Sequence, residues 1–118
     1  DTRIEVDLFM FPGVIGKREE RPRCAFMLLV VEGKQGLVLG HEMLEPDPTI
    51  KAMYGIVPLT LVALLANKGL VPKEVRVRTH MLEQLLQPLV EELGFEVKRS
   101  IRLPALDQAK EFIMGRFF

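Results

Sequence analysis

The first residues of the chain alternate between charged and hydrophobic side chains. From Arg3 to Phe11, the hydrophobic positions Ile4, Val6 and Leu8 are separated by the charged residues Glu5 and Asp7. A period of two places successive side chains on opposite faces of an extended chain. The segment is therefore predicted to be a β-strand with its charges on one face, and Pro12-Gly13 is predicted to end it.

Two further strands follow in a pattern that predicts a hairpin. The run from Ala25 to Val31 is almost wholly apolar, which is typical of a strand buried in the middle of a sheet. Residues 32–36 form a short polar turn with two glycines, after which the segment from Leu37 to Met43 returns as the partner strand. The first third of the chain is thus predicted to be a three-stranded antiparallel meander.

From residue 47 onward the hydrophobic period becomes that of a helix. Asp47-Pro48 predicts a helix start, because Asp can cap free amides and Pro is tolerated at the first helical position. Hydrophobic residues then recur at spacings of three and four up to Leu65, and Gly69 is predicted to end the helix. Pro58 in this helix, and Pro88 in a later one, are predicted to kink or split their helices.

The remainder of the chain alternates short strands with helices. Residues 75–79 and 95–98 are predicted strands. Thr79 is the predicted cap of a helix that stops at Gly94, and Pro104 opens a last helix. The order βββαβαβα predicts right-handed crossovers and parallel pairing in the second half. We therefore expect an α/β fold in which a mixed five-stranded sheet packs against three helices.

The chain length and its apolar segments limit the organisation and the location of the protein. A chain of 118 residues can bury one substantial core, so residues 1–118 are expected to form a single domain. The chain begins at Asp1 rather than at a methionine, as expected of a piece of a longer protein. Its longest apolar stretch, residues 56–66, is about half the length of a membrane span, so no membrane association is expected. The single cysteine, Cys24, cannot form an internal disulfide, which fits a cytoplasmic location.

The charge distribution and the motifs narrow the function classes. The chain has 16 basic and 16 acidic residues, whereas broad nucleic-acid binding requires a basic face. The basic cluster in the sequence comprises Lys17, Arg18, Arg21 and Arg23. We expect a solvated loop there, with contact to a nucleic-acid backbone or an acidic protein as the alternative. No phosphate-binding glycine loop, dinucleotide fingerprint or zinc spacing is present, so no cofactor is expected.

Three stretches and the order of the elements carry resemblances to known families. Residues 4–43 resemble the start of a transposase core, with a first strand that bears Asp7, an apolar strand, a tight turn and a glycine-containing return strand. The whole order resembles the ribonuclease H-like superfold, which includes retroviral-type integrases and DDE transposases. The stretches LLVVEGKQGLVLGHEMLEPDP and RLPALDQA are similar to an uncharacterised bacterial family, a domain of unknown function that brings no activity with it.

The superfold resemblance implies where catalytic carboxylates would lie. Its enzymes carry one carboxylate on the first strand, one at the end of the fourth strand and one or more on helices, and these hold two divalent ions. Asp7 matches the first position, and Asp107 or Glu111 would supply the acid on the last helix for Mg²⁺ or Mn²⁺. The fourth strand instead carries Arg76 and Arg78, whose charge would repel metal ions.

Ion pairing is the simpler interpretation of the same charges. The first and fourth strands of this superfold are parallel neighbours, so Asp7 is predicted to pair with Arg76 or Arg78 on the adjacent strand. Asp107 and Glu111 lie four residues apart and are predicted to form a solvated helix face, with Asp107 in the first turn. Ion pairing of Asp7 is thus the preferred hypothesis, and metal binding is the alternative.

The sequence therefore supports two hypotheses about function. The first is a non-catalytic ribonuclease H-like domain that binds or scaffolds within a larger protein or assembly. Its partner is expected to be another protein, a flanking domain or a second copy, because the neutral net charge does not favour nucleic acid. The alternative is a divalent-metal-dependent nuclease or polynucleotidyl-transfer enzyme that uses Asp7 with Asp107 or Glu111.

Overall fold

The computed structural model describes residues 2–15 and 23–117, and this part of the chain contains one five-stranded sheet. In chain order the strands are β1 (Arg3–Ile15), β2 (Arg23–Glu32), β3 (Val38–Leu44), β4 (Glu74–Val77) and β5 (Glu96–Arg99). Across the sheet the order is β3-β2-β1-β4-β5. β1 and β3 both run antiparallel to β2, whereas β4 runs parallel to β1 and to β5. The predicted antiparallel meander, followed by parallel crossovers, is confirmed.

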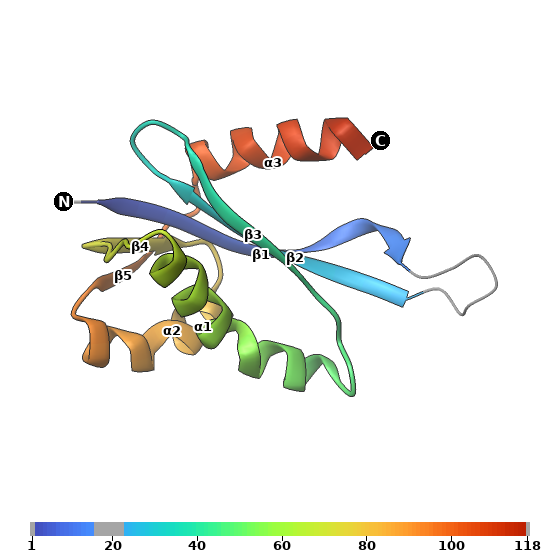
Figure 1. The fold of residues 1–118 in the computed structure, drawn as a ribbon, viewed down its shortest axis with the longest axis horizontal. Coiled ribbons are helices and arrows are strands. Elements are labelled where there is room, and N and C mark those ends of the chain that lie inside the picture. Colours follow the sequence, from blue (N-terminus) through green and yellow to red (C-terminus); the bar gives the residue numbers. More distant parts are fainter. Residues whose placement is uncertain (1, 16–22, 118) are drawn as a thin grey trace.

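Helices cover both faces of the sheet (Figure 1). α1 (Ile50–Asn67) and α2 (His80–Leu93) pack on one face, and α3 (Pro104–Phe117) packs on the other. Within the described residues this gives three layers, with the sheet in the middle. The predicted α/β class with three helices is therefore confirmed.

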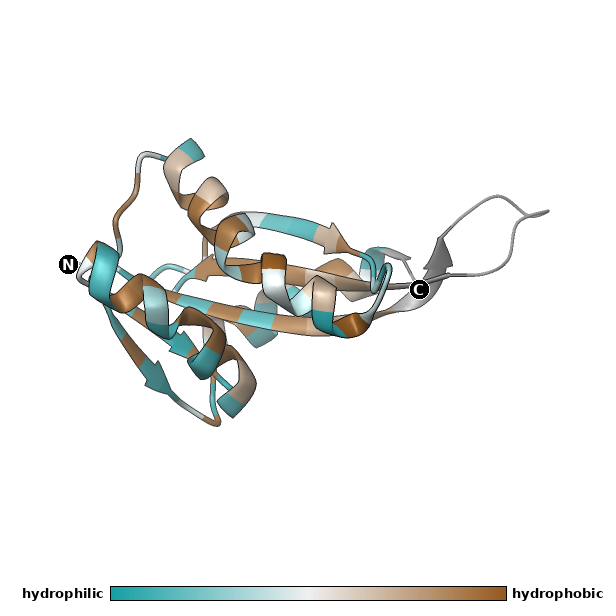
Figure 2. Cartoon of the chain, turned by 90° about the horizontal axis from the view of Figure 1, so that it is seen from below, coloured by the Kyte–Doolittle hydropathy of each residue, from teal (hydrophilic) through white to brown (hydrophobic). Residues whose placement is uncertain are grey.

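Each face of the sheet has its own hydrophobic cluster. The cluster beneath α1 and α2 includes Leu28 and Val30 of β2, and the smaller cluster beneath α3 includes Leu29 and Val31. Successive side chains of β2 thus alternate between two apolar environments, which explains why this strand is apolar throughout. Seen from the side of α1 and α2, hydrophobic and hydrophilic residues alternate along both helices and strands (Figure 2).

Local capping signals fix the ends of α1 and α2. Thr79 Oγ1 accepts a hydrogen bond from the Leu82 amide at 3.2 Å, and Gly94 ends α2 with φ 77°, both as predicted. The predicted cap at Asp47 is wrong. α1 begins at Ile50, and Thr49 Oγ1 accepts a hydrogen bond from the Ala52 amide at 3.0 Å. A cap must directly precede the first helical residue, and Thr49 satisfies this condition where Asp47 does not.

Proline interrupts the elements less than the sequence predicts. β1 continues to Ile15, because its pairing with β2 skips Pro12 and Gly13 and resumes at Val14. β4 pairs with β1 only over residues 3–6 of β1. Pro12 therefore has no neighbour in β4 that would need the backbone N–H that proline lacks. α1 runs unbroken through Pro58 and α2 through Pro88, so neither helix is split. In each helix, buried residues on both sides of the proline pack the helix against the sheet.

α1 is unusually apolar for a helix that lies on a surface of the domain. Its 18 residues have a mean hydropathy of 1.6, so its length and composition reach those of a membrane span, a test that core helices of soluble proteins also pass. In the structure, four residues face the sheet and are buried: Met53, Val57, Leu61 and Leu65. These buried residues make up 22% of the helix, and apolar side chains such as Leu59, which is 71% exposed, lie on its outer side.

Candidate functional site

The charged residues singled out in the sequence meet where β1 and β4 approach the start of α3. Asp7 lies on β1 and is only 4% exposed, Arg78 directly follows β4, and Asp107 lies in the first turn of α3. Arg78 Nη1 is 3.5 Å from Asp7 Oδ2, and Arg78 Nη2 donates a hydrogen bond of 2.6 Å to Asp107 Oδ1. One guanidinium therefore lies between two carboxylates from different elements.

The parallel pairing of β1 and β4 creates the first half of this arrangement. Glu5 faces Arg76 and Val6 faces Val77 across the two strands, so Asp7 and Arg78 follow at the next position on each chain. Arg78 rather than Arg76 pairs with Asp7, and Arg76 Nε donates to Glu74 Oε2 at 2.6 Å. Glu74 also pairs with Lys98 of β5 at 3.0 Å.

A buried carboxylate positions the second half of the site by holding the start of α3. Glu5 is 1% exposed, and its Oε1 accepts a hydrogen bond of 2.9 Å from the Leu106 amide. The residue before α3 is Leu103, which has no polar side chain to cap the first amides. Glu5 supplies that acceptor from β1, at the positive end of the helix dipole. The alternating pattern of β1 does not predict this role of Glu5.

Burial and charge act in opposite directions on Asp7. Burial raises the pKa of Asp7 above its ordinary value, while the Arg78 guanidinium, the Leu8 amide that bonds Asp7 Oδ1 at 3.0 Å, and Lys110 all lower it. The hydrogen bond to Asp107 raises the pKa of Arg78, although burial opposes this shift. The guanidinium thus stays charged, and the closer of its two partners is Asp107.

The carboxylate oxygens of Asp7 and Asp107 are placed to pair with an arginine rather than to bind two metal ions. Mg²⁺ requires several oxygen ligands at about 2.0–2.1 Å, whereas the oxygens of Asp7 and Asp107 already face a cationic side chain. Within the described part of the chain, no three His, Cys, Asp or Glu side chains gather in a group that could hold a metal ion. The side chains of Asp7 and Asp107 are therefore arranged around Arg78.

Comparisons with known proteins give the family and the fold. The model of a domain of unknown function, DUF6930, matches residues 1–114. The chain belongs to this family. No curated protein matches the sequence.

The fold of this chain resembles those of several solved structures. A chain of the Mos1 strand transfer complex is 16% identical with a TM-score of 0.54, over 86% of this chain and 35% of that one. The catalytic core domain of BIV integrase is 15% identical with a TM-score of 0.50, over 97% and 64%. RNase H1 from Halobacterium salinarum NRC-1 is 18% identical with a TM-score of 0.47, over 87% and 89%.

These similarities show a ribonuclease H-like fold, as the sequence predicted. The chain spans only 35% and 64% of the first two proteins, and the low identities carry no information about chemistry. The function of this DUF6930 domain must therefore be inferred from the arrangement of its own side chains.

The other predicted site residues lie apart from Arg78 or outside the described residues. Glu111 is exposed one turn beyond Asp107 on α3 and is not among the groups that contact Arg78. Lys110 lies over the ring of Phe9 at 4.3 Å. Lys17, Arg18 and Arg21 lie outside the described residues, and Arg23 belongs to β2 with its side chain outside them. The expected solvated loop and its alternative contact role stay predictions.

Proposed function

We propose that this domain is a non-catalytic ribonuclease H-like module that binds or scaffolds within a larger protein or assembly. The observation that supports the proposal is the position of Arg78 between Asp7 and Asp107. In the metal-dependent enzymes that the fold resembles, divalent cations neutralise carboxylates at the end of these strands. Here an internal guanidinium supplies positive charge to Asp7 and Asp107.

Electrostatics favours Arg78 over a bound metal ion as the positive partner of Asp7 and Asp107. Arg78 is tethered to β4, so it does not have to be drawn from solution and cannot dissociate. A divalent ion that approached the two carboxylates would meet the guanidinium charge at close range in a partly buried setting, where repulsion is stronger than in water. The arginine thus competes directly with metal binding.

A metal titration of matched variants tests the proposal. Thermal unfolding would be followed with millimolar Mn²⁺ or Mg²⁺ for the wild type, Arg78→Asn and Arg76→Asn. We expect no change in Tm for the wild type or for Arg76→Asn, which disrupts only the pair with Glu74. Arg78→Asn should gain a few degrees, because about 1 kcal/mol of binding free energy shifts the Tm of such a domain by roughly 4–8 °C.

Two results would count against the proposal. A rise in the wild-type Tm that Asp7→Asn removes would show that the native residues bind metal. An Arg78→Asn variant that does not respond to either ion would show that Arg78 is not what excludes metal.

The competing function is a metal-dependent nuclease or polynucleotidyl-transfer enzyme that uses Asp7 with Asp107 or Glu111. It draws support from the convergence of Asp7 and Asp107, from β1 and α3, on one point. Cleavage of a labelled oligonucleotide in Mn²⁺ by the wild type, lost in Asp7→Asn, would establish it. Asp107→Asn and Glu111→Gln would then identify the second acid. We expect no cleavage by the wild type.

A further inference from the structure

One edge of the sheet is formed by β3, whose outer backbone is a possible site for another strand. Within the described residues, β3 pairs only with β2, so the outer side of β3 is an edge of the sheet. Natural proteins protect such edges with charged residues, proline or very short strands. β3 is seven residues long and contains no proline, and Glu42 is its only Asp, Glu, Lys or Arg residue. We refer to the outer side of residues 38–44 as the β3 edge.

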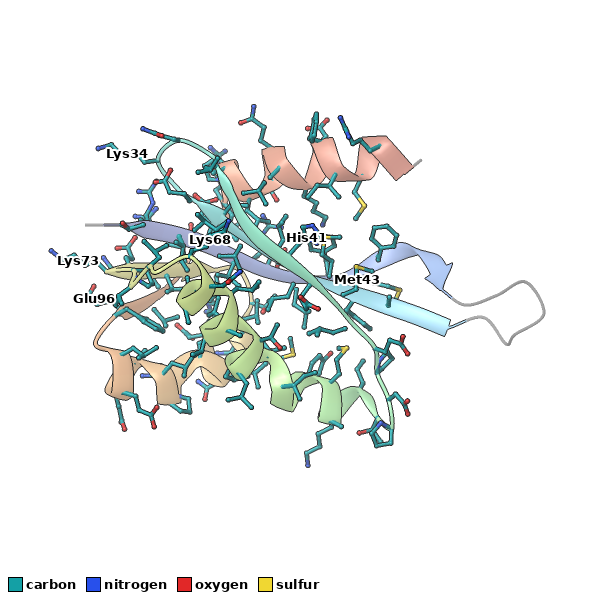
Figure 3. All side chains as sticks on the ribbon, in the orientation of Figure 1. Lys34, His41, Met43, Lys68, Lys73 and Glu96 are labelled. Carbon is teal, nitrogen blue, oxygen red and sulfur yellow. The ribbon has the colours of Figure 1, made fainter. Side chains whose placement is uncertain are left out.

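The opposite edge of the sheet shows the protection that the β3 edge lacks. β5 has only four residues, and its charged side chains are well exposed, with Glu96 at 72% and Lys98 at 55%. Glu96 lies far along the sheet from His41 and Met43 of β3 (Figure 3). Within the described residues the two edges of the sheet therefore differ in length and in charge. The pairing of β3 with β2 skips Leu39, so the regular part of the β3 edge is residues 40–44.

The side chains of β3 divide between the two faces of the sheet. His41 and Met43 face Leu29 and Met27 of β2, which belong to the cluster beneath α3. Glu42 faces Leu28, which belongs to the cluster beneath α1 and α2. A strand added beside β3, about 4.8 Å away, would send its own side chains alternately to the same two faces.

A groove borders β3 on each face of the sheet, and the α3-side groove also reaches Phe11 of β1 and Met27 of β2. The α3-side groove, of about 460 Å³, is lined by Val38, His41 and Met43 of β3 and by Phe112, Ile113 and Arg116 of α3. The α1-side groove, of about 560 Å³, is lined by Glu42 and Leu44 of β3 and by Ile56, Thr60 and Ala63 of α1. An open edge with a groove on both faces is the geometry that strand addition requires.

The lining of the two grooves defines the sequence that would fit. The α3-side groove is mostly apolar and has Arg116 and His41 as its basic groups, so it suits branched apolar side chains with an acidic residue near one end. The α1-side groove mixes Thr60 and Glu42 with apolar side chains, so it suits small polar residues. The complementary strand thus alternates large apolar and small polar residues.

A second copy of this chain fits the β3 edge less well. An antiparallel pair of identical strands is related by a two-fold axis perpendicular to the sheet, which sets the central residue against itself. For β3 that residue is His41, or Gly40 or Glu42 after a shift by one position, and the register centred on Glu42 opposes two carboxylates. A strand of a different sequence is free of this symmetry and can set an acidic residue against Arg116, so we take a partner protein as the occupant.

We propose that the β3 edge binds an extended segment of a partner protein by strand addition, with alternating apolar and small polar side chains. The proposal rests on the binding role proposed above and names its partner class. Main-chain hydrogen bonds to β3 would provide affinity, and the two grooves would provide specificity.

A titration with a defined peptide tests this site. The probe is a blocked seven-residue peptide, the length of β3, in which valine and threonine alternate and the ends are glutamate. Its control has proline in place of the central residue, which cannot pair as a strand. Backbone amide shifts would be followed by NMR up to about 1 mM peptide, which detects binding near −4 kcal/mol.

We expect saturable shifts of the amides of residues 38–44 with the alternating peptide and none at residues 96–99. Met43→Lys and Val38→Lys should each weaken binding about tenfold or more, because a charge then points into the apolar groove. These side chains are 37% and 39% exposed, so the fold should tolerate both changes. Ile101→Lys, at a position 89% exposed, is the matched control and should bind as the wild type does.

Three results would overturn the proposal. The first is the absence of saturable shifts, and the second is binding that survives both lysine substitutions. The third is a wild-type dimer, seen in sedimentation velocity, that Met43→Lys converts to a monomer, because the occupant would then be a second copy. Arg78→Asn should leave peptide binding unchanged, so a failure here is distinguishable from a failure in the metal titration.

Discussion

Asp7 is a buried acid whose burial is only partly offset by its neighbours. Burial raises the pKa of Asp7 above 3.8, and the Arg78 charge and the Leu8 amide do not cancel this effect. An acid with a raised pKa binds its proton more tightly in the folded chain than in the unfolded chain. Its contribution to the free energy of unfolding is therefore fully present below about pH 3.8 and is lost as pH rises through the folded-state pKa.

Asp7→Asn should remove this pH dependence. Asparagine keeps the Oδ1 acceptor for the Leu8 amide but cannot ionise. We expect the free energy of unfolding of the wild type to fall relative to that of Asp7→Asn as pH rises from about 4 to 7. Urea unfolding at a series of pH values measures the difference. Parallel profiles for the two proteins across this range would contradict the prediction.

Glu32 provides a control of opposite sign. Hydrogen bonds from the backbone amides of Gln35 and Lys34 lower the pKa of Glu32 below 4.5. Its stabilising contribution is present above pH 4.5 and is lost as pH falls through the folded-state pKa. Glu32→Gln should therefore lose stability relative to the wild type at neutral pH and recover the difference in acid.

At the scale of elements, a buried acceptor on β1, Glu5, anchors the start of α3. Glu5→Ala should destabilise the domain by about 1–3 kcal/mol, because the buried Leu106 amide loses its partner. Glu5→Gln keeps an oxygen acceptor and should lose less. Urea unfolding at pH 7 measures both, with Glu96→Ala on the exposed edge strand as the control. Equal stability of Glu5→Ala and Glu96→Ala would contradict a role for Glu5 as the anchor of α3.

The elements show which features a sequence can reveal and which it cannot. Alternation and capping are local, so strand order, the Thr79 cap and the Gly94 stop are predictable. Competition between neighbouring signals is harder to predict. Thr49, not Asp47, caps α1. Pro12 and Gly13 lie in a β-bulge, in a part of β1 with which β4 does not pair.

The candidate site was partly predictable, because the superfold that the chain resembles places its first and fourth strands side by side. The parallel neighbours β1 and β4 predict that Asp7 meets an arginine of the fourth strand. The choice of Arg78 and the arrival of Asp107 depend on how α3 crosses the sheet. The Glu5 contact that fixes this crossing joins residues 101 positions apart, and periodicity carries no information on such a contact.

At the scale of the whole molecule, the sheet separates two clusters of unequal size. Among the residues whose burial is described, α3 packs on the smaller cluster, of six, whereas α1 and α2 share a cluster of fifteen. The same helix carries Asp107 of the candidate site and one wall of the α3-side groove. Undocking of α3 alone would therefore break the pair with Arg78 and alter the proposed partner site, while the larger cluster stays intact.

Two neighbouring residues of β2 allow this independence to be tested. Leu28 and Leu29 are both 0% exposed but lie in different clusters, so each change to alanine removes the same atoms from a different side of the sheet. Each should cost about 2–5 kcal/mol in the layer that it supports. In native-state hydrogen exchange, Leu29→Ala should lower the opening free energy of the α3 amides, whereas Leu28→Ala should lower that of β1, β2 and α1 and leave α3 unchanged. If all amides shift together in both variants, α3 opens only with the whole domain, and its layer cannot act as a separate unit.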